Sequence, residues 1–385
     1  MELSDGLRIV GGLVLLVVGG ELLVKGATSL ARRMGMSTLL VGLTIVAVAT
    51  SAPELAVSLD AVRGGRPDVA VGNVVGSNTV NSLLVVGVTA LVARLSVERR
   101  LVKLDLPIMV GIGVLFVALA FDGRISPLDG AILLACFVAQ LVLGVVVARR
   151  EARAEEPARA EGAGDGASEA GGDATSGTDA SLSLPLALVA LVAGVGLLVV
   201  GADLLVQGAV GVATALGVSG LVVGLTIVAV GTSLPEIASS IAAVRHGEHQ
   251  LVLGGVVGSN IANIGLVLGL PALIPPADGG PAGIPVPSAV VALDAPLMLA
   301  AMVALLPVAF TGYVIGRREG VCFVALYAAY LAYVVLAASQ HDALAGFTSV
   351  MAWFVLPLLA LVGVGVVSHE LGLRRARGSS HPSIR

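Results

Sequence analysis

Residues 42–54 read GLTIVAVATSAPE, and residues 224–236 read GLTIVAVGTSLPE. The two stretches lie 182 residues apart, and eleven of their thirteen positions are identical. The same offset relates residues 72–87, GNVVGSNTVNSLLVVG, to residues 254–269, GGVVGSNIANIGLVLG, where ten of sixteen positions match. An apolar bias alone would repeat Val and Leu, but it would not repeat Thr-Ser-x-Pro-Glu and Gly-Ser-Asn in register. The chain is therefore an internal duplication.

The composition around these blocks is that of a membrane protein. Of 385 residues, 57% are hydrophobic and only 12% are charged, whereas a soluble domain carries about 25% charge. This balance excludes an ordinary soluble enzyme, a nucleic-acid-binding protein and a disordered chain. The apolar runs are continuous rather than alternating, which indicates helices and not a β-barrel. We therefore predict an all-α polytopic membrane protein.

A helix needs about 20 apolar residues to cross a bilayer, and we expect eleven such spans. They lie near residues 7–25, 38–62, 69–93, 104–121, 128–148, 185–206, 219–244, 251–273, 288–310, 320–338 and 346–368. Each repeat then holds five spans, an odd number, so the second repeat enters the membrane from the opposite side. Two inverted five-helix repeats are typical of secondary transporters.

The chain divides into four regions on this interpretation. They are the first five-helix repeat (1–148), an acidic cytosolic linker (149–184), the second, inverted repeat (185–340), and an extra C-terminal transmembrane helix with a basic tail (341–385). Residues 151–180 carry eight Asp and Glu residues among Ala, Gly and Ser. Such a segment cannot bury a core, so we expect a mobile tether in preference to an acidic cation sensor.

The basic residues predict the orientation in the membrane. With the N-terminus outside, 17 Lys and Arg residues fall in cytoplasmic loops and the C-terminal tail, and only four lie outside. Cytoplasmic loops carry the excess of Lys and Arg in most membrane proteins. We therefore expect a multi-pass plasma-membrane protein with the N-terminus outside and with the linker and the C-terminus in the cytoplasm.

Glu54 and Glu236 are the most informative residues, because each lies inside an apolar span. A carboxylate there costs at least about 2.5 kcal/mol unless it is paired or hydrated, and no basic residue lies at the centre of either span. A proton or a bound cation must then neutralise it. Protonated glutamates that hold helices together are the alternative, which the duplication of the glutamate disfavours.

A proline precedes each glutamate and adds oxygen ligands. Pro53 and Pro235 free the backbone carbonyls of the residues four positions earlier, Ala49 and Gly231. Free carbonyls inside a membrane are tolerated where they line a cavity. Hydroxyl groups on the same turns come from Thr50, Ser51, Thr232 and Ser233. Carboxylate, carbonyl and hydroxyl oxygens are the ligands of hard cations.

The second duplicated block holds a further polar cluster. Its members are Ser77, Asn78 and Asn81, matched by Ser259, Asn260 and Asn263. Ser77 and Asn81 are four residues apart and share one helix face. Ser and Asn in membranes also hydrogen-bond between helices, and that role and ligation stay equally open for Asn78 and Asn260. We favour ligation for the other four.

Together, the two blocks resemble the α-1 and α-2 repeats of the cation/Ca2+ exchanger superfamily, and most closely its prokaryotic sodium/calcium exchangers. The resemblance covers the first ten spans. It implies a secondary antiporter that exchanges Na+ for Ca2+ by alternating access and extrudes Ca2+, with its first and sixth helices sliding across the core. We expect no enzyme activity, cofactor, nucleic acid or obligatory protein partner; the partners are the two cargo ions and the lipid bilayer.

The resemblance also implies a ligand set in a central cavity. Glu54 and Glu236 would bind Ca2+ with the backbone oxygens of Thr50 and Thr232. The Na+ ligands would be Ala47, Ser51, Ser77, Ala229, Ser233 and Ser259, with Asn81 and Asn263 as polar residues at the centre.

Two departures bear on the coupling ion. Exchangers that also carry K+ have an aspartate at the position of Asn263, and proton/calcium exchangers typically have a glutamate after Gly-Asn, where this chain reads Gly72-Asn73-Val74. Both favour Na+, although an H+- or K+-coupled exchanger of Ca2+ or another divalent cation stays an alternative. A channel would need no counter-ion. An intramembrane enzyme would need a His or Lys in the core to activate a nucleophile, and none is present.

Overall fold

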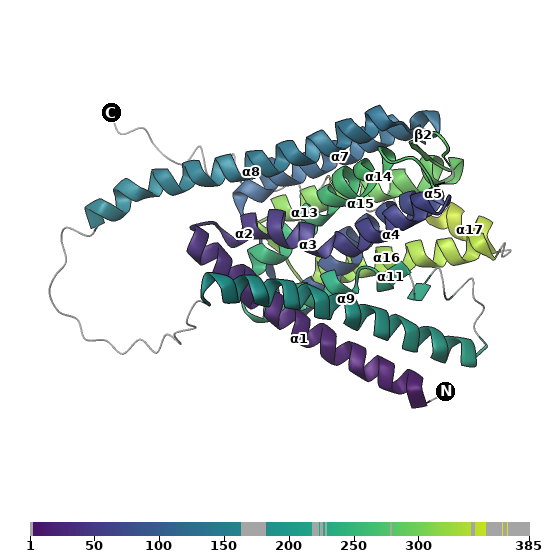
Figure 1. Ribbon diagram of the computed structural model, residues 1–385, viewed down its shortest axis with the longest axis horizontal. Coiled ribbons are helices and arrows are strands. Elements are labelled where there is room, and N and C mark those ends of the chain that lie inside the picture. The colour runs from purple at the N-terminus through teal and green to yellow at the C-terminus, as the bar shows by residue number, and fades with distance from the viewer. Residues whose placement is uncertain are drawn as a thin grey trace.

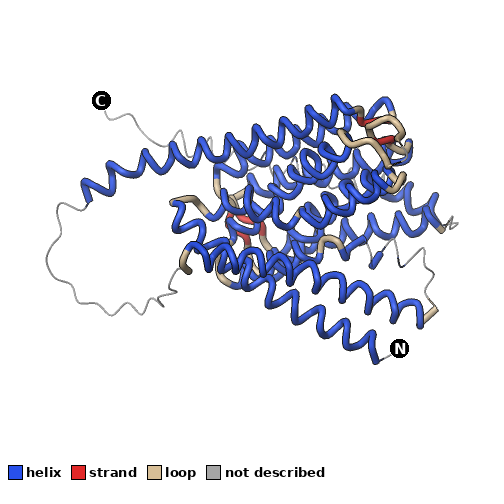
Figure 2. The backbone as a smooth tube through the Cα atoms, viewed as in Figure 1, coloured by secondary structure: helices blue, strands red, loops and turns tan. Residues whose placement is uncertain are grey.

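The computed structural model describes residues 3–162, 182–217, 223, 226–227, 229–277, 279–339, 343–351, 364 and 368. These residues form one bundle of helices that run roughly along its long axis (Figure 1). Four strands of two residues each are the only strands among them (Figure 2). The predicted all-α class is confirmed.

The first half contains the following elements: α1 (Leu3–Met34), α2 (Thr38–Val41), η1 (Gly42–Val46), α3 (Ala47–Thr50), α4 (Ala52–Arg63), α5 (Pro67–Thr79), η2 (Val80–Val85), α6 (Val86–Val92), β1 (Leu95–Ser96), η3 (Leu101–Asp105), α7 (Leu106–Leu119), η4 (Ala120–Asp122), β2 (Arg124–Ile125) and α8 (Pro127–Gly162). Of the η segments, η4 is a 3₁₀ turn and the others are π-helical.

The second half contains α9 (Leu184–Ala215), α11 (Ala229–Gly231), α12 (Leu234–Arg245), α13 (His249–Ala262), η6 (Asn263–Leu268), α14 (Gly269–Ala272), β3 (Ile284–Pro285), η7 (Val290–Asp294), α15 (Ala295–Phe310), β4 (Val314–Ile315), α16 (Arg317–Ala338) and α17 (Ala343–Val350). Both η6 and η7 are π-helical. The π-helical turns after α5 and α13 repeat at equivalent places in the two halves.

Nine helical stretches of the described residues are long and apolar enough to cross a membrane, and they coincide with nine of the eleven expected spans. The expected seventh and eleventh spans, 219–244 and 346–368, lie partly outside the described residues. The parts that are described are helical, mainly in α12 and α17. The chain is thus a multi-pass membrane protein, and the full count of eleven stays a prediction.

One expected boundary falls inside a helix. We expected the first repeat to end at residue 148 and a mobile linker to follow, but α8 continues to Gly162. Residues 151–162 are rich in Ala, Glu and Arg, which favour helix even where no core is available. Acidic composition alone therefore misjudged this first part of the linker, and residues 163–181 lie outside the described residues.

The strand pairs reveal the inverted symmetry of the two halves. Strand β1, after the third span, pairs antiparallel with β4, and β2 pairs antiparallel with β3, which follows the eighth span. The two pairs lie at opposite ends of the bundle (Figure 2). The third and eighth spans are equivalent in the duplication, yet the strands that follow them lie at opposite faces, which is the arrangement of inverted repeats.

The long helices α1 and α9 pack against each other along one flank of the bundle (Figure 1). Glycines allow this close approach. A Cβ atom at Gly12 would lie 2.7 Å from the carbonyl oxygen of Gly201, and one at Gly194 would lie 2.6 Å from the backbone nitrogen of Leu23. Small residues at such contacts are the usual means by which membrane helices come together.

The centre of the bundle is formed by the two spans that carry the second duplicated block. In the most apolar stretch of Pro67–Val92, 78% of residues are buried, and in that of His249–Ala272 the share is 89%. The spans on the outside of the bundle are buried to 50% or less. The polar residues of the block therefore lie at the core of the molecule rather than facing lipid.

Candidate cation site

A break in the helix positions each of the two glutamates. Helix α3 ends at Thr50 and α4 begins at Ala52, with Ser51 between them at φ −83° and ψ 0°. In the second half α12 begins at Leu234, after Ser233 at φ −97° and ψ 8°. A proline occupies the first turn of α4 and of α12, where a backbone N–H is not needed. The two glutamates follow directly, so both lie in a first helical turn near the middle of the bundle.

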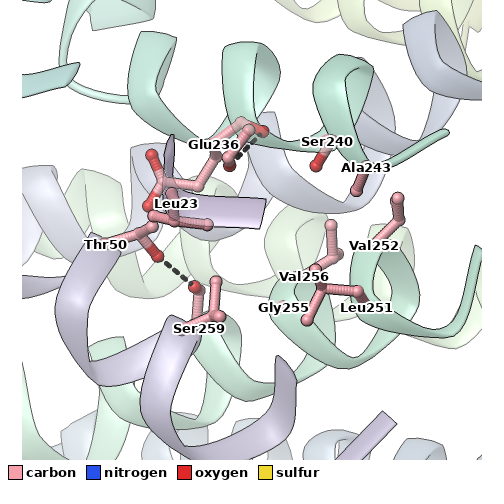
Figure 3. Close-up of a pocket in the computed structure, with 12 residues that line it drawn as sticks. Leu23, Thr50, Glu236, Ser240, Ala243, Leu251, Val252, Gly255, Val256 and Ser259 are labelled. Atoms are coloured by element: carbon pink, nitrogen blue, oxygen red, sulfur yellow. Dashed lines mark hydrogen bonds between the residues drawn. The ribbon is translucent and has the colours of Figure 1, made fainter. Parts of the chain in front are cut away.

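Glu54 and Glu236 are brought together in the core. The two residues are 1% and 4% exposed, and Thr50, one turn before Glu54, lies beside Glu236 (Figure 3). Among the described residues, no hydrogen bond of ordinary geometry reaches any of the four carboxylate oxygens, although the Thr50 side chain lies next to Glu236, and neither glutamate takes part in a salt bridge. Two unpaired carboxylates in a buried site strongly disfavour each other unless a positive charge is shared between them.

The polar residues of the second block surround this pair. Ser77, Asn81, Ser259 and Asn263 are all buried. The π-helical segment η6, which begins at Asn263, packs against α4, and η2, which contains Asn81, packs against α12. Each glutamate helix thus contacts the π-helical turn of the other half.

Several predicted ligand atoms have no protein partner. Within the described part of the chain, no hydrogen bond satisfies the buried hydroxyls of Ser51, Ser77 and Ser233 or either side-chain polar atom of Asn81. Buried polar atoms in proteins are nearly always hydrogen-bonded. A concentration of unsatisfied oxygens beside two carboxylates is a donor set suited to a hard cation.

Three of the asparagines form a network between the two halves. Asn78 donates from Nδ2 to the backbone oxygen of Asn260 (3.3 Å) and accepts at Oδ1 from Nδ2 of Asn263 (3.0 Å). Asn260 donates from Nδ2 to the hydroxyl of Ser82 (3.0 Å). These bonds join the two halves, so Asn78 and Asn260 make interhelical contacts, while Oδ1 of Asn260 has no partner among the described residues. Asn263 belongs to the same network through its nitrogen, which leaves its Oδ1 without a partner among the described residues.

The remaining predicted residues lie around the breaks. The Thr50 hydroxyl is 3.1 Å from that of Ser259 and 3.4 Å from the Ala47 carbonyl oxygen, and its side chain lies beside Glu236 (Figure 3). Ala47 packs on Gly258, where a Cβ atom would approach it to 2.6 Å. Thr232 is half-buried in the break before Ser233, and Ala229 belongs to α11 with its side chain outside the described set.

The sequence did not identify Asn73 as a neighbour of Glu54. Asn73 donates from Nδ2 to the backbone oxygen of Glu54 and to the hydroxyl of Ser58, both at 3.1 Å. A signal for it was available, because the duplicated blocks read GNVVGSN and GGVVGSN and thus differ at Asn73 and Gly255. That difference shows only that the halves are unequal at this position, and its meaning depends on which residues surround it.

A cavity of about 20 Å³ reaches the site from one side, which is room for about one water molecule. Thr50, Glu236 and Ser259 form its inner end, and Ser239 and Ser240 of α12 line its wall (Figure 3). The rest of the lining is mainly apolar, so the hydroxyls of Ser239 and Ser240 are the polar groups between Glu236 and the outer end of the cavity.

The chain matches the family model described as sodium/calcium exchanger protein over residues 6–146 and 186–336. These two ranges include both duplicated blocks and leave out the whole acidic segment.

Similar proteins agree with that match. The sodium/calcium exchanger MaX1 of Methanosarcina acetivorans is 33% identical, over 83% of this chain and 95% of its own length. The putative antiporter CaxA of Alkalimonas amylolytica is 38% identical, over 77% of this chain and 86% of its own. A solved structure of the sodium-calcium exchanger NCX_Mj, soaked with Na+ and Sr2+, superposes with a TM-score of 0.69 at 30% identity, over 86% of this chain and 99% of that one.

Proposed function

The chain belongs to the sodium/calcium exchanger protein family, and from that premise we propose that it is a secondary antiporter that exchanges Na+ for Ca2+ by alternating access and extrudes Ca2+. The family supports cation/Ca2+ exchange, and the proposal adds the coupling ion, the direction and the mechanism. The observation that carries it is the pair of buried glutamates, one from each inverted half, whose carboxylate oxygens have no hydrogen-bond partner among the described residues.

The proposed Ca2+ ligands are Glu54 and Glu236 with the backbone oxygens of Thr50 and Thr232. Two carboxylates balance the charge of one Ca2+, and carboxylate and carbonyl oxygens are the ligands that this ion takes. The proposed Na+ ligands are Ala47, Ser51, Ser77, Ala229, Ser233 and Ser259, with Asn81 and Asn263 at the centre of the cavity. Because both ions need the same oxygens, they cannot fill the site together, and their competition provides the coupling.

The proposed movement involves α1 and α9. Glycines along their contact bring the backbones of α1 and α9 close together without bulky side chains between them, and α1 also packs against α12. The pair would slide over the core and expose the site first to one face and then to the other. Either cargo must first neutralise the glutamates, since unpaired carboxylates could not be carried past apolar side chains.

We assign the faces of the membrane by the basic residues. The N-terminus would lie outside, and the face that carries β1 and β4, together with the linker and the C-terminus, would be cytoplasmic. This face carries Arg32 and Arg33 at the end of α1 and Arg317 at the start of α16, as expected for the cytoplasmic side.

The test is 45Ca2+ uptake into Na+-loaded proteoliposomes, with Na+, K+ or choline outside and the pH clamped. We expect uptake that needs internal Na+, ignores K+ and disappears in Glu54→Gln. The matched control is Asp60→Asn on the same helix α4, where the exposed carboxylate pairs with Arg66 at 3.7 Å. A surface pair of this kind contributes about 0–1 kcal/mol, so the control should transport like the wild type.

Other outcomes would replace the proposal. Uptake that follows a pH gradient without internal Na+ would assign the protein to proton-coupled exchange, and uptake that requires K+ would make it a K+-assisted exchanger. Flux that needs no counter-ion would indicate a channel.

A further inference from the structure

The two glutamates differ in what lies beside their backbones. In the first half, Asn73 of α5 bridges α4 and α5, since its amide nitrogen bonds both the carbonyl oxygen of Glu54 and the hydroxyl of Ser58. The asparagine side chain thus occupies the space between the two helices directly behind the glutamate.

In the second half this space is open. The residue equivalent to Asn73 is Gly255 of α13, and the cavity of about 20 Å³ lies against it (Figure 3). The residue equivalent to Ser58 is Ser240, which lines the cavity. The carbonyl oxygen of Glu236 accepts a hydrogen bond from the hydroxyl of Ser239 of its own helix at 3.2 Å, and Gly255 has no side chain that could bridge to it as Asn73 bridges to Glu54.

Close packing does not explain Gly255. A Cβ atom there would have one neighbour within 4 Å among the described residues, a methyl group of Val46 at 3.9 Å. Gly254 and Gly258 of the same helix differ, because their Cβ atoms would come within 2.4 Å of Leu39 and 2.6 Å of Ala47. Those two glycines are needed for helix contact, whereas Gly255 leaves room that a side chain could fill.

The cavity leads from Glu236 toward one face of the bundle. Its outer wall includes Ala243, Leu251 and Val252, which lie near the turn between α12 and α13. That turn is at the face of β1, where Gln250 donates to the carbonyl oxygen of Ser96 at 3.0 Å. Along residues 251–260, Gly255 alone is partly exposed, whereas the residues of the outer wall are buried.

We propose that Gly255 keeps a passage for a small hard cation open between Glu236 and the face of β1 and β4, while Asn73 closes the equivalent passage to Glu54. The hydroxyls of Ser239 and Ser240 line the open passage and replace part of the hydration of the ion. The inference rests on the proposed function only in naming Ca2+ and Na+ as the ions; the inequality of the two passages stands on geometry.

Accessibility to Ag+, a thiol-reactive ion of about the size of water, tests the passage without transport. In full-length protein lacking the free cysteines Cys136 and Cys322, Ser240→Cys is compared with Ser58→Cys. A thiol that has reacted with Ag+ no longer reacts with maleimide, so the loss of maleimide labelling after denaturation measures the extent of the Ag+ reaction. We expect Ag+ to react at least roughly tenfold faster with the cysteine at 240. Equal rates would overturn the proposal.

Reciprocal changes at the asymmetric position sharpen the test. Gly255→Asn should protect the cysteine at position 240, and Asn73→Gly should expose the one at position 58, each by roughly tenfold. If Gly255→Asn does not fold, the Asn73→Gly comparison decides alone. A failure of Asn73→Gly to raise the rate at position 58 would contradict the assigned role of the asparagine.

Transport supplies an independent readout. Gly255→Asn should slow Na+-dependent 45Ca2+ exchange by roughly tenfold or more, while equilibrium 45Ca2+ binding changes little because both glutamates are intact. Gly255→Ala adds only one methyl group, whose nearest neighbour is Val46 at 3.9 Å, so it should slow exchange less than Gly255→Asn. Exchange at the wild-type rate in Gly255→Asn would refute the passage and leave the exchanger function intact. An absence of Na+-dependent flux in the wild type would refute that function, and the Ag+ comparison would still decide the passage.

Discussion

The two inverted halves carry the same broken helix and the same glutamate, but they differ in what surrounds it. Glu54 has its backbone oxygen held by Asn73, whereas Glu236 borders a cavity beside Gly255. The residues that both halves share include the proposed oxygen ligands, whereas Asn73 and Gly255, at which the halves differ, border the space beside each glutamate. Duplication therefore accounts for a symmetric site, and single substitutions account for unequal access to it.

The asparagines show a second inequality of the same kind. Asn263 donates to Asn78 and joins the network between the halves, whereas its counterpart Asn81 has no hydrogen-bond partner among the described residues. One member of this related pair is thus held through its amide nitrogen and the other is not, while the Oδ1 atoms of both have no partner among the described residues.

The largest expected effect tests the symmetric part of this comparison. Glu54→Gln and Glu236→Gln should each reduce Na+-dependent 45Ca2+ flux by at least about 100-fold, because breaking a buried charge pair costs about 3–5 kcal/mol. Initial rates in proteoliposomes with matched protein content provide the measurement. Losses that differ tenfold or more between the two variants would show that the halves do not contribute equally.

Removal of the ion should affect stability. Saturating Ca2+ at about 100 times its Kd stabilises a protein by about 2.7 kcal/mol, which raises the Tm by about 3–5 °C. We expect chelation to remove this gain in the wild type. Either glutamine variant should show no Ca2+-dependent shift, and its cation-free Tm should exceed that of the wild type because an unpaired buried charge is gone. If a glutamine variant kept half of the Ca2+-dependent shift in Tm, the two glutamates would belong to two independent Ca2+ sites.

The asparagine pair should separate stability from binding. Asn263→Ala removes the 3.0 Å bond to Asn78 and leaves a buried acceptor unsatisfied, at a cost of about 1–3 kcal/mol. Asn81→Ala breaks no hydrogen bond to a described residue. Cation-free thermal unfolding in detergent should therefore show a lower Tm for Asn263→Ala alone. Equal losses in the two variants would remove the distinction between them.

The smallest expected effect concerns the threonines. Thr50→Val loses the 3.1 Å bond between hydroxyls to Ser259, which contributes about 1 kcal/mol, or about fivefold in Ca2+ affinity. No described residue hydrogen-bonds to the Thr232 hydroxyl, so Thr232→Val should change affinity less. Valine retains the backbone oxygens proposed as ligands, and 45Ca2+ binding isotherms measure both variants. A loss of hundredfold or more would mean that the hydroxyls themselves bind Ca2+.

Much of the fold could be predicted from the sequence, because its causes are local. Apolar runs of membrane length predicted nine spans that the described residues contain, and the odd number of spans per repeat predicted the inversion that the strand pairs reveal. The breaks before Glu54 and Glu236 followed from the prolines beside them. The continuation of α8 to Gly162 was missed, because acidic composition was weighed above helix propensity.

The contacts across the halves could not be predicted in the same way. The partners of Asn78 are Asn260 and Asn263, which lie far along the chain, and no periodicity encodes such a pairing. The glycines of α13 pose the same difficulty. Gly254 and Gly255 look alike in a sequence, but the first is crowded by Leu39 and the second faces open space. Only the neighbours in space distinguish a glycine needed for packing from one that opens a passage.

Equilibrium 45Ca2+ binding to the purified protein, titrated with Na+, tests the central claim most directly, namely that both halves build one site that Ca2+ and Na+ share. We predict one Ca2+ bound per chain, displaced competitively by Na+, and lost completely in Glu54→Gln and equally in Glu236→Gln. Binding of a Ca2+ ion that survives in either variant, or that Na+ does not displace, would contradict the account.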